Sequence, residues 1–149
     1  PRFAAHIAYY APCMARFEDK RTTGAPVLML AGGDDTIANP ERCAAIASDL
    51  QAGGSPVNAI TYPGAAHQWD GGFPGRRLIG SSLAACDFRV ASDGSVRDRR
   101  TTLPMIDGLT RRITLGLCIG PGYPIARDDE VRARSNRDSG AFLARAFRR

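Results

Sequence analysis

The sequence predicts an α/β fold with a parallel sheet, and three observations lead to this expectation. Residues 27–31 (VLMLA) form a short apolar run typical of a buried strand, and residues 57–62 (VNAITY) are expected to form another. Between them lies a segment whose apolar residues recur at helical spacing. A strand–helix–strand unit with short links forms a right-handed crossover, so the two strands are expected to be parallel and adjacent or close.

The first strand of this sheet is expected upstream, at residues 7–10. These residues are the apolar centre of the run FAAHIAYYAPC, which ends at the helix- and strand-breaking Pro12. Residues 14–25 are mostly polar and end in Thr-Thr-Gly, which predicts a surface connection to the next strand.

The helix of the crossover has start and stop signals of its own. Asn39 offers a capping side chain, Pro40 suits the first helical position, and Glu41 is favourable beside the positive end of the helix dipole. Gly53 and Gly54 are expected to end the helix. One apolar face is expected from four residues at helical spacing, Cys43, Ile46, Ala47 and Leu50.

After residue 70 the pattern changes. We expect a β-hairpin around Asp93-Gly94, a further short strand at 111–117, a rigid loop at 120–124 and a helix from Asp129 onward. The chain is therefore interpreted as one partial domain in three parts. Residues 1–70 form the sheet core, residues 71–128 an irregular or β extension, and residues 129–149 a C-terminal helix.

Composition excludes some classes of protein. There is no run of 18 or more apolar residues, so no membrane span is predicted. The net charge of +5 is uneven, because residues 1–75 carry five basic and seven acidic side chains and residues 76–149 carry fifteen and eight. Acidic residues are interspersed in the basic half and no nucleic-acid-binding motif is present, so we interpret the basic half as a solvated surface and expect no nucleic-acid partner.

The four cysteines, Cys13, Cys43, Cys86 and Cys118, form no C-x-x-C pair and have no histidine nearby, which argues against a zinc site. They are compatible with two disulfides in one of three pairings, or with small buried thiols in a reducing cytosol. The sequence does not distinguish a cytoplasmic from a periplasmic or secreted protein.

Two residues at the expected carboxyl edge of the sheet could act together. Asp35 follows the strand at 27–31, and His67 follows the strand at 57–62. In a parallel sheet both loops open at the same edge. A carboxylate that orients a histidine, which in turn takes a proton from a nucleophile, is the acid–base part of a catalytic triad. Asp35 and His67 are therefore the candidate catalytic residues. The alternative is a loop-capping aspartate and a boundary histidine.

The segments LAGGDD and PERC (30–35 and 40–43) and YPGAAHQWD (62–70) resemble the dienelactone hydrolase family of the α/β-hydrolase superfamily. HIAYYAPC resembles the strand that precedes them in the family, and AFLA (141–144) resembles its last helix. Residues 71–128 match weakly, and Trp69 stands where phenylalanine is more usual. The resemblance implies that Asp35, three residues after Gly32, is the triad acid rather than Asp34, and that His67 is the base.

The resemblance implies the C-terminal part of an α/β-hydrolase sheet, of about three parallel strands with a crossover helix. It implies hydrolysis of a small ester, lactone or related acyl substrate by nucleophile–His–Asp catalysis, with no metal or organic cofactor. The family's nucleophile, Cys or Ser in a G-x-C/S-x-G elbow, precedes the acid, and residues 1–34 contain no such elbow. We therefore expect the nucleophile in an upstream half of the same domain, and an inactive chain without it.

A second match to the elbow pattern lies at 116–120, GLCIG, but the PGYP that follows it cannot continue as the helix that an elbow needs. Cys118 is therefore not expected to be the nucleophile, and Ser81 and Ser82, which lack the second glycine, are weaker still. The family's strand order places Cys13 and Cys43 side by side, which implies that they pair and leaves Cys86 with Cys118. The alternative function is a catalytically inactive α/β module that binds another chain.

Overall fold

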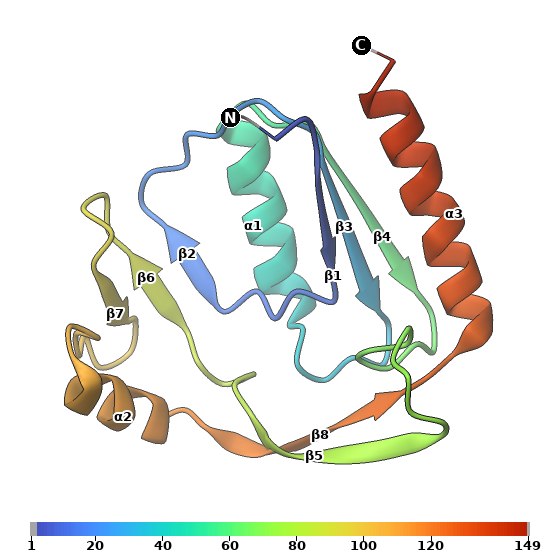
Figure 1. The fold of residues 1–149 in the computed structure, drawn as a ribbon. Helices are drawn as coiled ribbons and strands as arrows, with labels where there is room; N and C mark the ends of the chain where they lie inside the picture. The colour runs from blue at the N-terminus through green and yellow to red at the C-terminus, as the bar shows by residue number, and fades with distance from the viewer. Residues whose placement is uncertain (1–2, 149) are drawn as a thin grey trace.

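A computed structural model of the chain describes residues 3–148 and has a mixed α/β architecture, as predicted (Figure 1). The described elements, in chain order, are β1 (His6–Tyr9), β2 (Ala15–Phe17), β3 (Val27–Gly32), α1 (Pro40–Ala52), β4 (Val57–Tyr62), β5 (Arg76–Ser82), β6 (Phe88–Val90), β7 (Val96–Asp98), α2 (Gly108–Gly116), β8 (Gly120–Ala126) and α3 (Asp129–Ala146). No helix in this part of the chain is both long and apolar enough to cross a membrane.

The main sheet contains β1, β3 and β4 in the order β1-β3-β4, and all of its strands are parallel. Successive residues of a strand face opposite sides of a sheet, so β3 contributes to two separate clusters. Leu28 and Leu30 pack with Val131 and Phe142 of α3, while Val27 and Met29 pack toward α1. The sheet is thus placed between α1 and α3, one helix on each face (Figure 1).

Helix α1 begins and ends as the sequence predicts. The side chain of Asn39 accepts a hydrogen bond from the backbone N–H of Arg42 (2.9 Å), Pro40 occupies the first turn, and Gly53 caps the C-terminus. The four residues expected on its apolar face all pack against the Val27 and Met29 cluster. This crossover fixes β3 and β4 as parallel neighbours, and so brings the loops that follow them to the same edge.

The extension, residues 71–128, consists of a ribbon and a small sheet. Strands β5 and β8 form an antiparallel ribbon, and Figure 1 shows it running along the carboxyl edge of β3 and β4. Strands β6 and β7 form the predicted hairpin around Asp93-Gly94, and β6 also pairs in parallel with β2. The ribbon therefore connects the edge of the main sheet with the second sheet, which lies beyond α1.

Three expectations for these connecting regions are wrong. Residues 111–117 are not a strand, because Asp107 and Thr110 form a capping box that starts helix α2. Residues 120–124 are not a loop but most of β8, where prolines are tolerated because this part of the strand pairs with β5 alone. The expected connection at 14–25 contains β2, whose partner β6 is distant in sequence.

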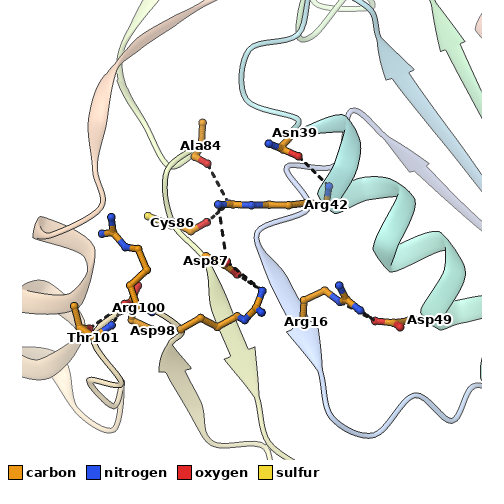
Figure 2. Close-up of polar contacts among 11 residues, drawn as sticks. Arg16, Asn39, Arg42, Asp49, Ala84, Cys86, Asp87, Asp98, Arg100 and Thr101 are labelled. Atoms are coloured by element: carbon orange, nitrogen blue, oxygen red, sulfur yellow. Dashed lines mark hydrogen bonds and ion pairs between the residues drawn. The ribbon is translucent and has the colours of Figure 1, made fainter.

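Both disulfides implied by the family resemblance are present, Cys13–Cys43 and Cys86–Cys118. The first ties the segment after β1 to the first turn of α1, and the second joins the ends of β5 and β8 that lie away from the main sheet. Figure 2 shows a non-covalent link between α1 and the extension, formed by the side chain of Arg42. Its guanidinium donates hydrogen bonds to the carbonyl oxygens of Cys86 (2.6 Å) and Ala84 (3.3 Å).

Candidate active site

The loops that carry Asp35 and His67 lie against each other at the carboxyl edge of the sheet. The backbone N–H of Gly33 donates to the carbonyl of Tyr62 (2.8 Å), and that of Asp34 donates to the carbonyl of Ala65 (2.9 Å). A Cβ on Gly32 would lie 2.3 Å from the oxygen of Ala65, so the approach of the two loops requires glycine at this position. The glycine that marks the motif in the sequence therefore has a steric role in joining the acid loop to the histidine loop.

The structure brings Asp35 and His67 together as a buried pair. The Oδ2 atom of Asp35 lies 2.8 Å from Nδ1 of His67, and the side chains are 0% and 9% exposed. The other carboxylate oxygen, Oδ1, accepts from the backbone N–H groups of Ile37 (2.8 Å) and Ala38 (3.3 Å). Both oxygens of the acid are thus engaged, which fixes the plane of the carboxylate. Asp34, the alternative acid, is exposed.

The surroundings of Asp35 favour its ionised form. Burial acts to raise the pKa of this carboxyl. The pKa is lowered by the hydrogen bond to His67, by the backbone N–H of Ile37, by the charge of His67 and by the backbone N–H of Ala38. The result is a pKa below the ordinary value for aspartate. A carboxylate can only accept hydrogen bonds, so Nδ1 of His67 carries a proton, and in the neutral form of the ring Nε2 keeps its lone pair.

Nε2 of His67 has no hydrogen-bond partner among residues 3–148, and no serine or cysteine in this range donates to it. An imidazole oriented by a carboxylate, with its second nitrogen unoccupied, can take a proton from a hydroxyl or thiol and return it to a leaving group. This is the chemistry that the arrangement supports.

Of the side chains considered as nucleophiles in the sequence, Ser81 lies exposed on β5 and the other two are engaged elsewhere. Cys118 is 3% exposed and bonded to Cys86, so it has no free thiol. Ser82 is buried at the end of β5, where its hydroxyl accepts from the backbone N–H of Ala84 (3.0 Å). His6, the other histidine of the chain, lies at the exposed start of β1 with its ring against Phe3.

Aromatic residues surround the pair, and sequence reasoning did not single them out as part of the site. The ring of Tyr10 lies edge-on to His67 with centroids 4.6 Å apart, and the ring of Tyr123 lies 5.2 Å away at 89°. Trp69 is fully buried against Tyr10 and donates from Nε1 to the Ser135 hydroxyl (3.1 Å). Tyr10 ends an apolar run and Tyr123 stands among glycines and prolines, so neither carries a sequence signal for a site.

The described residues contain no group of three or more histidine, cysteine, aspartate or glutamate side chains placed to hold a metal ion.

Residues 1–73 match the model of the dienelactone hydrolase family. The match contains both the Asp35 and the His67 loops, and it ends three residues into the extension, before β5. At the level of the family it indicates a hydrolase, and it confirms the resemblance seen in the sequence. Comparisons with curated proteins and with solved structures gave no significant match.

Proposed function

From the relationship of residues 1–73 to the dienelactone hydrolase family, we propose that this chain supplies the acid and the base of a hydrolase that cleaves an ester, lactone or related acyl bond. The observation that carries the proposal is the buried 2.8 Å contact between Asp35 Oδ2 and His67 Nδ1. Asp35 orients the imidazole and stabilises its protonated form, and His67 acts first as general base and then as general acid.

The proposal places the nucleophile outside this chain. A cysteine or serine in a sharp strand-to-helix turn would precede residue 1 in the same domain and would present its sulfur or oxygen to Nε2 of His67. In the same proposal, β1, β3 and β4 are the C-terminal strands of an α/β-hydrolase sheet. Strand β1 pairs only with β3 among the described strands, so its other edge is available for a preceding strand.

The test is hydrolysis of p-nitrophenyl acetate and of a simple aryl lactone by a polypeptide extended upstream to include the elbow. The chain 1–149 alone should be inactive. In the extended protein, His67→Gln should reduce the rate to near background. Asp35→Asn should reduce kcat by about 10⁴-fold, the loss expected when a triad acid becomes an amide.

His6→Gln is the matched control, since it removes the other histidine of the chain without touching the Asp35–His67 pair. It should leave the rate unchanged. An active chain 1–149 would contradict the upstream nucleophile. An extended protein that folds but hydrolyses neither substrate, or that is indifferent to His67→Gln, would favour the inactive binding module instead.

A further inference from the structure

The extension begins and ends at the loop that carries His67. The chain leaves this loop after Asp70 and returns at the end of β8, where Ile125 forms a parallel bridge with His67. The backbone N–H of Ala126 donates to the carbonyl of His67 (3.2 Å), and that of Asp128 donates to the carbonyl of Trp69 (2.9 Å). The histidine loop is thus held on one side by the acid loop and on the other by a strand of the extension.

The extension also places a side chain against the catalytic ring. Tyr123 lies two residues before Ile125 on β8, and residues two apart on a strand share a face. Since Ile125 is buried where it meets the histidine loop, Tyr123 faces the same way, and its ring lies edge-to-face with His67 at 5.2 Å. Tyr123 is outside the region that matches the family, whereas Tyr10, whose ring lies 4.6 Å from the same imidazole, is inside it.

The ribbon is built to hold Tyr123 in place. A Cβ on Gly122 would lie 1.7 Å from the carbonyl oxygen of Ile79, so β5 and β8 approach each other closely next to Tyr123. The far end of the ribbon is closed by the Cys86–Cys118 disulfide. A positioning residue must restrict its neighbour, and a side chain on a strand fixed at both ends can do so with little loss of its own conformational entropy.

On the side of Tyr10, the second aromatic residue against the imidazole of His67, the backbone is strained. Its φ of 38° is unfavourable for an aromatic residue and costs on the order of 1–3 kcal/mol. The ring is held by edge contacts to Trp69 and His67, and its hydroxyl donates to Asp70 (3.1 Å). Burial, together with the charge and hydrogen bond of Asp70, raises the pKa of Tyr10 to about 12, so the phenol stays protonated and keeps donating.

We propose that Tyr123, supplied by the extension, is a positioning residue for His67, which makes residues 71–128 an integral part of the catalytic site. Its ring blocks rotation of the imidazole away from Asp35 and shields the Nδ1–H···Oδ2 hydrogen bond from water. The inference rests on the proposed role of His67 as base. It adds that the orientation of this base depends on a segment beyond the family-type loops.

The experiment uses the chain 1–149 itself and the imidazole Nδ1–H resonance in proton NMR spectra. The chain has two histidines, so His6→Gln and His67→Gln assign the signal. In the unmodified chain the Nδ1–H of His67 should appear downfield of the amides and exchange slowly with water. Tyr123→Ala should accelerate this exchange at least about tenfold or abolish the signal, because the bond opens locally more often. Tyr123→Phe, which keeps the ring, should preserve it.

Ile79→Ala is the matched control, because Ile79 is the cross-strand partner of Tyr123 in the ribbon. It should leave the exchange rate unchanged. If Tyr123→Ala does not fold, Tyr123→Leu removes the ring while filling the space, and should show the same acceleration. Exchange as slow in the folded Ala or Leu variant as in the parent chain would overturn the proposal.

Asp35→Asn separates this inference from the proposed function. If the His67 signal is unchanged both in Asp35→Asn and in Asp35→Ala, which leaves no acceptor oxygen, the acid–histidine pair itself is refuted. If Asp35→Asn abolishes the signal while the folded Tyr123 variants keep it, the pair stands and only the positioning role of Tyr123 fails.

Discussion

The sheet core and the extension hold themselves together by different means. In the sheet core, β3 is covered on both sides, and its leucines are 0% and 1% exposed between the sheet and α3. The core of the extension contains three buried residues, Cys86, Phe88 and Cys118, two of which form a disulfide. Small units that bury little apolar surface generally need covalent links. Each region contains one disulfide, but the sheet core also has a large packed core, whereas in the extension the disulfide makes up most of the buried cluster.

Removing the disulfides tests this difference most strongly. The two bridges span nearly equal separations, 30 and 32 residues, so the chain-entropy contribution of each is about 3–4 kcal/mol. Cys86→Ser with Cys118→Ser also removes most of the extension's core. We expect this pair of changes to unfold the extension while the sheet persists. Cys13→Ser with Cys43→Ser should lower stability without separating the two regions.

Hydrogen exchange read by mass spectrometry distinguishes these outcomes. Loss of amide protection should be confined to residues 76–126 in the first double variant, and urea unfolding should become two-step. If both double variants lose protection uniformly, the two regions form one cooperative unit and the contrast between them is wrong.

Within the described part of the chain, Arg42 is the less exposed of two arginines whose side chains link the regions, the other being Arg89, which pairs with Glu18, and the removal of Arg42 should have the next largest effect. A guanidinium that donates to two backbone carbonyls contributes about 1.5–3 kcal/mol when partly buried. Arg42→Met keeps the apolar stem but leaves the oxygens of Ala84 and Cys86 without this donor. Urea unfolding followed by circular dichroism should show a loss of about 2 kcal/mol.

The matched control is Arg21→Met. Arg21 pairs with Asp19 on the surface, where its side chain is 89% exposed, and its replacement should not change the unfolding midpoint measurably. Equal shifts for the two arginines would mean that Arg42 acts through general charge rather than as a link to the extension.

The same contrast explains what could be predicted from the sequence. The strand–helix–strand unit was predictable because its signals are local: a capping Asn39, a following Pro40 and short links that force a parallel pairing. Asp35 and His67 were predictable because parallel strands send their loops to one edge. Their 2.8 Å contact is the outcome of that topology.

Apart from the β6–β7 hairpin, the extension could not be predicted, because its other pairings are distant in sequence. Strand β5 pairs with β8 across α2 and the β6–β7 hairpin, and β2 pairs with β6, so no local period marks them. Residues 111–117 have β-branched residues typical of strands, but the Asp107–Thr110 capping box outweighs this preference. Tyr123 was missed for the same reason. Its contact with His67 depends on a ribbon that exists only once β8 has returned to pair with β5.

In each region a different buried carboxyl should make stability depend on pH, and this is the smallest of the expected effects. Asp35 in the sheet core and Asp98 in the extension are both buried. Burial acts to raise the pKa of Asp98, but hydrogen bonds from the backbone and side chain of Thr101 and from the backbone of Arg100 lower it, so both carboxyls have a pKa below the ordinary value.

A carboxyl whose pKa is lowered by folding contributes stability that is fully present above the unfolded pKa of about 3.9 and is lost as pH falls through the folded pKa. Asp35→Asn and Asp98→Asn retain an acceptor oxygen, so each should cost only about 1 kcal/mol at neutral pH. That cost should stay constant down to about pH 5 and shrink below pH 4, as the parent chain loses the same contribution. Hydrogen exchange at each pH should place the Asp35 effect in β3 and β4 and the Asp98 effect in β6 and β7. If the cost of either variant grows as pH falls, that carboxyl is stabilised in its protonated form, and for Asp35 this would also remove the charge that orients His67.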